Sequence, residues 1–415
     1  MSAPLVCLVT PGHLASTPRL VKSADALVGA GYRVHVVAAA PFPPADPLDA
    51  SILASAAWGY TRVPTRKGPA VLARKLLRRF ARVLVGRFDV SSPSWAALAQ
   101  SAEADHLASA AARIPAQLYL GHSIASLYPV AAAARARGSL YGFDIEDFHD
   151  AETEDAMADA AESRARRLLQ AAFLPGSRPL TCAAPLIGKK YAEAYGVRPA
   201  TVLNVFPTTH APAKARPART FTEELPAVLY WFSQTVGPGR GLENVLGVMG
   251  RMRTPCVLHV RGFAAPSYIE HLQETARVAG LRRPVIVLPP AEPGEMARLA
   301  SEADLGLSVE LPVPLNHDLC LPNKIFVYLM AGIPQILSST TAQRSFGGEL
   351  GEAALVCEMD QTDASASRID ALLGDPEAVR RARTAAWEAA HGRYCWEIEK
   401  RVLLEAVATV LPPTL

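Results

Sequence analysis

The sequence lacks the cysteine patterns that hold disulfide-bonded or zinc-bound domains together. Its six cysteines lie far apart, with no Cys-x-x-Cys pair and no cysteine and histidine cluster at zinc spacing. These absences predict a reducing compartment and no structural metal.

Long apolar runs and a strong net charge are also absent. No uninterrupted apolar stretch approaches the roughly 20 residues that a membrane-spanning helix needs, and the N-terminus lacks the pattern of a signal peptide. The formal net charge of +3 does not by itself indicate a nucleic-acid partner. We therefore expect a cytoplasmic protein, peripheral on the inner face of the membrane and without a nucleic-acid partner.

The length and the composition are those of a globular protein with two domains. A chain of 415 residues exceeds what one hydrophobic core usually organises. Half of the residues are hydrophobic (50%) and 20% are charged, which provides for a large core.

Short strand-like runs alternate with helical segments through most of the chain, and this alternation is typical of a parallel sheet with helices on both faces. In the first half the strand-like runs are residues 5–9, 33–39, 117–120, 139–143 and 179–182. In the second half they are residues 227–231, 256–260, 284–288, 304–309, 334–337 and 353–357.

Residues 206–226 interrupt the alternation with a proline-rich connector. We predict an N-terminal Rossmann-like domain over 1–205, a linker over 206–226 and a donor-binding domain over 227–385. A C-terminal helix within 386–415 returns to the first domain. The predicted fold class is α/β, with two doubly wound domains that face one another across a cleft.

A Gly-rich loop follows the strand-like run 227–231 and precedes a helix. Its glycines let backbone N–H groups approach an anion, and Arg240 adds a positive charge at the helix start, as in a diphosphate site. The loop matches neither Gly-x-Gly-x-x-Gly nor the P-loop pattern, which disfavours dehydrogenases and NTPases. The alternative is a flexible loop with a solvated arginine.

A second segment, 322–334, predicts a short helix with an unusual charge. Pro322 and Asn323 open the helix, and Gly332 and Pro334 close it. Lys324 lies in the first turn, where the helix dipole disfavours a cation. A bound anion would account for it.

The run from Pro322 to Pro334, followed by Ser338-Ser339 and Gly347-Gly348, resembles the donor motif of GT-B glycosyltransferases, particularly glycosyltransferase family 4. The loop 233–243 is similar to that family's phosphate loop. The resemblance implies a retaining, metal-independent transferase that uses a nucleoside-diphosphate sugar as co-substrate and has no other cofactor.

The resemblance also implies roles for individual residues. Arg240 would stabilise the departing diphosphate, Lys324 would lie near the phosphates, and His122, which follows a strand, would approach the transferred sugar. These three residues are the catalytic candidates, although a lone histidine is equally often structural. The donor-binding candidates are Ser233, Thr235, Gly237, Gly239, Arg240, Gly241, Pro322, Asn323, Lys324 and Val327.

The sequence departs from the family at three positions. Thr235 occupies a position where the family often has an arginine, and Val327 one where it usually has a glutamate that binds the ribose hydroxyls. Leu319 stands where another acid is expected. A valine cannot accept hydrogen bonds from hydroxyl groups, so the ribose is held differently, the donor differs, or the activity is weak or absent.

Two loops of the first half resemble the family's acceptor side. Gly12, His13 and Arg19 belong to the first loop, and Asp144 and Glu146 follow a strand. Arg19 pointing into solvent and acids that complement a helix N-terminus are the alternatives.

A basic stretch without acids lies between residues 66 and 88, and its helical spacing suits an anionic membrane surface. Its basic residues are Arg66, Lys67, Arg74, Lys75, Arg78, Arg79, Arg82 and Arg87. The apolar residues between them are Val71, Leu72, Leu76, Leu77, Phe80, Val83 and Leu84. The alternative is a surface helix whose apolar stripe belongs to the core.

We therefore expect a glycosyltransferase that moves a sugar to a cytoplasmic-side glycan, a lipid-linked acceptor or another acceptor. A sugar-nucleotide epimerase on the same fold and a catalytically silent scaffold or partner subunit are the alternatives, because the fold alone does not choose among them.

Overall fold

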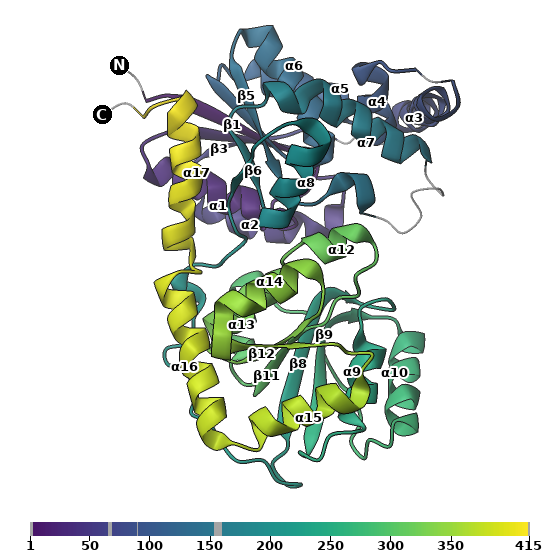
Figure 1. The fold of residues 1–415 in the computed structure, drawn as a ribbon. Coiled ribbons are helices and arrows are strands. Elements are labelled where there is room, and N and C mark those ends of the chain that lie inside the picture. The colour runs from purple at the N-terminus through teal and green to yellow at the C-terminus, as the bar shows by residue number, and fades with distance from the viewer. Residues whose placement is uncertain (1–2, 65–68, 89, 153–159, 414–415) are drawn as a thin grey trace. The chain divides into compact units, whose positions relative to one another are not determined.

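A computed structural model describes residues 3–64, 69–88, 90–152 and 160–413. It divides into two compact units (Figure 1). Unit 1 comprises Met1–Leu203 and Lys400–Leu415, and unit 2 comprises Asn204–Glu399. Arg66 and Lys67 of the expected basic stretch lie outside the described residues.

In the described part of unit 1, parallel strands form one sheet in the order β3-β2-β1-β4-β5-β6-β7. The strands are β1 (Leu5–Thr10), β2 (Arg33–Ala38), β3 (Gly59–Arg62), β4 (Leu118–His122), β5 (Leu140–Ile145), β6 (Leu180–Cys182) and β7 (Ala200–Thr201). The helices before β7 are α1 (Pro18–Gly29), α2 (Asp46–Ser55), α3 (Pro69–Arg87), α4 (Pro93–Gln100), α5 (Ala104–Arg113), α6 (Leu127–Arg137), α7 (Ala160–Phe173) and α8 (Pro185–Tyr195). Every residue of β1 is buried, as expected for a strand covered on both faces.

In unit 2, all of whose residues are described, a second parallel sheet has the order β10-β9-β8-β11-β12-β13. Its strands are β8 (Ala227–Val236), β9 (Cys256–Ala264), β10 (Ile286–Leu288), β11 (Leu305–Ser308), β12 (Gln335–Ser338) and β13 (Ala354–Cys357). Its helices are α9 (Leu242–Met249), α10 (Pro266–Val278), α11 (Met296–Ala300), α12 (Leu315–Leu319), α13 (Asn323–Ala331), α14 (Thr341–Leu350), α15 (Thr362–Leu373) and α16 (Pro376–Gly392).

Both sheets have the strand order of a doubly wound Rossmann-like domain, in which the order reverses beside the first strand. The predicted α/β class with two such domains is therefore confirmed. The strand-like runs of the sequence coincide with observed strands to within a few residues at each end, except that β8 and β9 run further, to Val236 and Ala264. The predicted domain limits and the cleft remain predictions.

Some elements were not expected from the sequence. β3 and β7 are short strands at the two edges of their sheet, and β3 (Gly-Tyr-Thr-Arg) has no apolar run because it is largely exposed. Helix α7 is described from Ala160, and residues 153–159 before it lie outside the described part.

The last helix, α17 (Trp396–Val410), crosses from one unit to the other in sequence. The hydroxyl group of Tyr32 donates a hydrogen bond to the carbonyl oxygen of Leu411 at 2.6 Å, which fixes the chain end on unit 1. Helix α16 runs without a break through residues 385 and 386, where a boundary was expected.

The loop between β8 and α9 lies tightly against the end of β11 because of one glycine. Gly241 has a φ of +75°, and a Cβ atom added to it would lie 2.1 Å from the carbonyl oxygen of Val309. Gly237, in the same loop, has open space around it. Gly241 is thus required both for its backbone conformation and for this close approach.

We predict that Gly241→Ala destabilises unit 2, by about 1–3 kcal/mol from backbone strain alone and by more from the clash with Val309. Gly237→Ala is the matched control, with an expected change within about 0.5 kcal/mol. Urea unfolding of the two variants measures the difference. Equal stabilities would contradict the assigned role of Gly241.

Candidate functional site

The candidate residues gather at the carboxyl ends of the central strands in each unit. The strand order reverses between β1 and β4 in unit 1 and between β8 and β11 in unit 2. Ligands of open α/β sheets bind at this point, because the loops diverge there and leave a crevice. His122 ends β4 in unit 1, and the Gly-rich loop follows β8 in unit 2.

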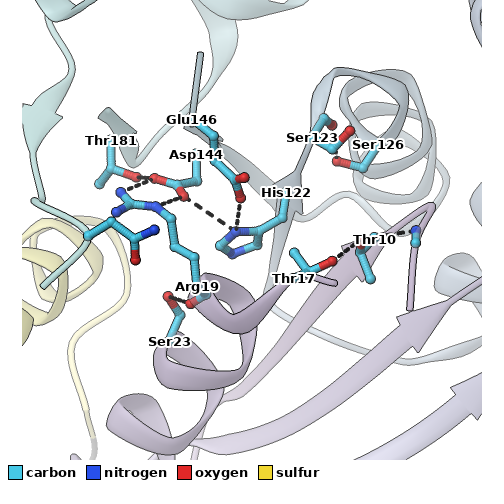
Figure 2. Close-up of polar contacts among 12 residues, drawn as sticks. Thr10, Thr17, Arg19, Ser23, His122, Ser123, Ser126, Asp144, Glu146 and Thr181 are labelled. Carbon is cyan, nitrogen blue, oxygen red and sulfur yellow. Dashed lines mark hydrogen bonds and ion pairs between the residues drawn. The ribbon is translucent and has the colours of Figure 1, made fainter. Parts of the chain in front are cut away.

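In unit 1, two carboxylates at the end of the neighbouring strand β5 lie beside the same ring nitrogen of His122. Its Nδ1 atom is 3.4 Å from Oδ2 of Asp144 and 3.6 Å from Oε1 of Glu146. Figure 2 shows both carboxylates reaching the imidazole from one side. His122 is only 2% exposed, so its imidazole is shielded from water and has these two acids as its charged neighbours.

These neighbours decide the protonation of His122. Burial favours the neutral imidazole, but the two nearby carboxylates of Asp144 and Glu146 outweigh burial and raise the pKa of His122 above its ordinary value. The imidazolium form is therefore stabilised in the folded protein.

Arg19 holds Asp144 in place from the first turn of α1. Its Nε and Nη2 atoms donate to the two carboxylate oxygens of Asp144 at 2.5 and 2.9 Å, and its Nη1 donates to the carbonyl oxygen of Val202 at 2.7 Å. The hydroxyl group of Thr181 donates to Asp144 as well. Arg19 is 4% exposed, so the alternative in which it points into solvent is wrong.

The arginine also fixes the charge of Asp144. Burial alone would raise the pKa of this carboxyl group, but the adjacent Arg19 holds it well below its usual range. One turn along α1, burial and the charge of Arg19 lower the pKa of Lys22 to about 7. Neither Lys22 nor Thr181 was expected at this site from the sequence.

His13 and Gly12 form the first loop of unit 1. Nδ1 of His13 lies 2.8 Å from Oδ2 of Asp49, and its Nε2 accepts a hydrogen bond from the backbone N–H of Phe42 at 2.8 Å. The N–H of Gly12 donates to Oγ1 of Thr10, and its carbonyl oxygen accepts from Ala40. Both ring nitrogens of His13 are thus engaged in holding the loop, whereas Arg19, Asp144 and Glu146 gather around His122.

His122, Asp144 and Glu146 each offer a ligand atom, and these atoms lie within 4.8 Å of one another. They are the residues of this cluster that could hold a metal ion. However, Arg19 already binds both oxygens of Asp144, and its charge would repel a cation. The arrangement therefore suits an ion-paired imidazolium better than a divalent metal.

In unit 2, the Gly-rich loop begins at a β-bulge. The pairing of β8 with β9 shifts between Phe232 and Thr235, so Ser233 lies in the bulge. Gly239 and Gly241 have positive φ values of 74° and 75°. Arg240, between them, is partly exposed and forms no hydrogen bond or ion pair with any residue that the structure describes.

Lys324 occupies the first turn of α13, as expected. The anion that it contacts is the side chain of Glu310. Nζ of Lys324 donates to Oε1 of Glu310 at 2.5 Å and lies 5.4 Å from the ring centroid of Trp231. Lys324 is 8% exposed. Pro322 precedes the helix, and Oδ1 of the exposed Asn323 accepts from Nδ2 of Asn204 at 2.8 Å.

Glu310 is the buried carboxylate of this site. Its Oε2 accepts hydrogen bonds from Oγ of Ser308 and Nε2 of Gln343, both at 2.9 Å. Burial would raise the pKa of Glu310, but the charge and hydrogen bond of Lys324 and the hydroxyl group of Ser308 lower it, so the group is ionised. Glu310 was not expected at the site, although its position directly after the strand-like run 304–309 could have indicated it.

The two positions where the family resemblance implies acids are apolar and buried in this fold. Val327 is 2% exposed in α13, and Leu319 is 4% exposed in α12. Thr235 is exposed near the end of β8. Among the residues of unit 2, Glu310 is the carboxylate that lies at the start of α13.

No family model and no curated protein sequence matches the chain. Solved structures match it over nearly its full length. Anabaena HepE, in complex with UDP and glucose, is 13% identical with a TM-score of 0.67, covering 98% of this chain and 100% of that one. Sucrose-phosphate synthase from Thermosynechococcus elongatus is 13% identical with a TM-score of 0.69, covering 97% of each chain. A putative UDP-N-acetylglucosamine 2-epimerase from Listeria monocytogenes is 12% identical with a TM-score of 0.56, covering 99% and 97%.

At this level of identity the likeness concerns the fold and leaves the chemistry open. Family 4 remains a prediction. Two doubly wound sheets with these strand orders, matched from end to end, show that the chain has the GT-B fold of glycosyltransferases.

Proposed function

We propose that the chain is a glycosyltransferase that takes a sugar from a nucleoside-diphosphate sugar. The observation that carries the proposal is the Gly-rich loop of unit 2, where Arg240 has no anionic partner among the described residues and lies directly before α9. An anion is stabilised at such a place by backbone N–H groups, the helix dipole and the guanidinium group together. The UDP complex of HepE, a protein of the same fold, supports a nucleotide-sugar donor.

In this proposal Arg240 and the N-terminus of α9 stabilise the negative charge that develops on the departing diphosphate. They supply the positive charge that a retaining, metal-independent transfer needs. Gly237, Gly239 and Gly241 allow the backbone to approach the phosphates, with Ser233 and Thr235 at the start of the loop.

Lys324 contributes only if the donor competes with Glu310, because the two side chains form a buried ion pair. Pro322 and Asn323 form the start of α13, next to Lys324 in sequence. Val327 offers no hydrogen bond to a ribose, so the nucleoside is held by other groups.

On the acceptor side, Glu146 is the carboxylate with room to bind a hydroxyl group. Its side chain is 32% exposed, whereas that of Asp144 is 9% exposed and bonded to Arg19. We propose that His122 approaches the transferred sugar and that the acceptor is a cytoplasmic-side glycan, lipid-linked or other. Gly12 and His13 then act by shaping the first loop, and Arg19 acts by holding Asp144 in place. A location on the inner face of the membrane belongs to the same proposal.

An epimerase is the second candidate, supported by the structural likeness to the putative Listeria 2-epimerase. A catalytically silent scaffold is favoured by Val327 and Leu319. Incubation with a donor alone separates these ideas, since conversion of the sugar without an acceptor identifies an epimerase. A failure of every nucleoside diphosphate to bind would favour the scaffold.

We predict that Arg240→Ala weakens the binding of a nucleoside diphosphate about 10- to 100-fold, the worth of a charge-assisted hydrogen bond to phosphate. Isothermal titration with UDP and other nucleoside diphosphates measures the change. Arg251→Ala, an exposed arginine just after α9, is the control and should bind like the wild type. Equal affinities of the two variants would refute the phosphate role of Arg240.

We predict that Glu310→Gln tightens binding of the same nucleotide by about 5- to 50-fold, because it removes a negative charge beside Lys324. The variant also leaves Lys324 without its counter-ion and lowers stability by about 3–5 kcal/mol. Thermal unfolding must therefore confirm that it is folded at the assay temperature. Glu358→Gln, which alters a surface ion pair with Arg344, is the matched control. Unchanged affinity in Glu310→Gln would remove Lys324 from the donor site.

We predict a pH-dependent contribution of His122 to stability. Because its pKa is raised on folding, the contribution is fully present below the ordinary pKa of histidine and is lost as the pH rises through the folded value. The unfolding free-energy difference between wild type and His122→Gln should therefore shrink as the pH rises above the ordinary pKa of histidine. Urea titrations at several pH values measure it. A difference that is constant or grows with pH would show that the carboxylates do not stabilise the imidazolium.

A further inference from the structure

Helix α3 turns a row of arginines toward the protein. Nη1 of Arg74 donates to Glu103 at 3.0 Å, Nε of Arg78 donates to the carbonyl oxygen of Ala99 at 3.1 Å, and Nη1 of Arg82 donates to Glu162 at 3.2 Å. These residues are four positions apart and therefore share one face of the helix. Ala81 and Val85 are fully buried beside them. The inner face of α3 is thus held on α4, α7 and the start of α5 (Figure 1).

Most of the large apolar residues of α3 face solvent. Among the side chains that the structure describes, six of the 15 exposed large hydrophobic residues lie on α3 or directly after it. They are Leu72 (62% exposed), Leu76 (58%), Leu77 (45%), Phe80 (53%), Val83 (45%) and Phe88 (64%). Exposed apolar residues are normal when scattered, but a contiguous group marks an interaction surface. Five residues of the expected apolar stripe are therefore outside the core, which contradicts the alternative for them; Leu84 is half-buried, and the side chain of Val71 lies outside the described part.

The same outer face carries charge of one sign. Lys75, Arg79 and Arg87 are exposed, and none forms an ion pair or hydrogen bond with a described residue. No acidic residue occurs between Leu72 and Phe88. Three cations among exposed leucines and a phenylalanine complement a surface that has negative charges on the outside and an apolar layer beneath them.

A cavity of about 470 Å³ lies where α3 approaches α7. Gly86 permits this approach, since a Cβ atom there would lie 2.8 Å from Cβ of Ala161. The lining residues are Gly86, Ala160, Arg164, Arg167, Leu168 and Ala171. Among the described lining residues, two guanidinium groups stand in an otherwise apolar wall, an arrangement that suits a phosphate attached to a hydrocarbon-bearing group.

We propose that the outer face of α3 docks on a bilayer surface that contains anionic phospholipid, and that the cavity beside Gly86 receives a lipid phosphate through Arg164 and Arg167. Leu72, Leu76 and their exposed neighbours enter the interface, while Lys75, Arg79 and Arg87 meet the headgroups. No described helix is long and apolar enough to span a bilayer, so the contact is interfacial. A second copy of this chain is a poor occupant, because a symmetric pairing would bring cations against cations.

The proposal concerns unit 1 alone and stands independently of the donor chemistry. Failure of nucleotide binding would leave it intact. Failure of lipid binding would remove the proposed membrane location and leave the donor site of unit 2 untouched.

The test is flotation of the full-length protein with vesicles of phosphatidylcholine alone or with added phosphatidylglycerol. We expect flotation with the anionic vesicles, weaker flotation with neutral ones, and a decline with salt. Leu72→Asp combined with Leu76→Asp should reduce the partition coefficient about tenfold or more, because two inserting side chains are lost and two repelling charges are added. The matched control is Leu48→Asp combined with Val278→Asp, which alters exposed residues of α2 and α10 and should float like the wild type.

The charged groups are tested separately. Lys75→Glu combined with Arg79→Glu should reduce anionic binding by about fivefold or more for each residue. Arg164→Ala combined with Arg167→Ala should reduce the preference for anionic over neutral vesicles, and an unchanged preference would overturn the cavity assignment. Circular dichroism and a thermal unfolding midpoint that equal those of the wild type show that each variant is folded.

Two results would overturn the docking proposal. One is flotation that is the same for neutral and anionic vesicles and for all variants. The other is self-association of the wild type that the Leu72 and Leu76 substitutions abolish without vesicle binding, measured by light scattering, which would make this face an interface between copies.

Discussion

Parallel strand pairing is the constraint on which both units depend. In a parallel sheet the connections must cross over the faces, so helices cover the strands and all carboxyl ends meet at one edge. This brings His122 from β4 and Asp144 from β5 together, because the two residues are register partners across the strands. In unit 2 the same rule brings the loop after β8 to the end of β11, where Gly241 touches Val309.

The two candidate sites share one electrostatic design. Each is built around a buried carboxylate, Asp144 in unit 1 and Glu310 in unit 2, that a buried cation and neutral donors hold in place. A buried charge without a partner is costly, so removing one member leaves the other strongly destabilised. The consequence for function is that Arg19 and Lys324 are already paired, while Arg240 and Glu146 are the more accessible charged groups.

Helix α3 is built on the opposite principle to an ordinary surface helix. Its inward arginines find acids and a carbonyl oxygen on α4, α5 and α7, which allows the leucines to remain outside. Exposing this apolar area to water is unfavourable, and burying it at an interface is favourable. A partner surface therefore accounts for this helix better than solvent does.

By itself the sequence determined the fold class, most of the strands, the short helix of segment 322–334 that Gly332 closes, and the glycine-rich loop before α9. These features could be predicted because hydrophobic patterns and glycine positions depend on short stretches of sequence. It also marked His122, Asp144 and Glu146 as strand-end residues. It did not reveal that Arg19 binds Asp144 over 125 positions of the chain or that Glu310 supplies the anion for Lys324. Nor did it reveal which face of α3 is buried. Those choices were decided only by the tertiary structure, since pairing between distant charges depends on how the strands are ordered in space and leaves no periodicity in the sequence.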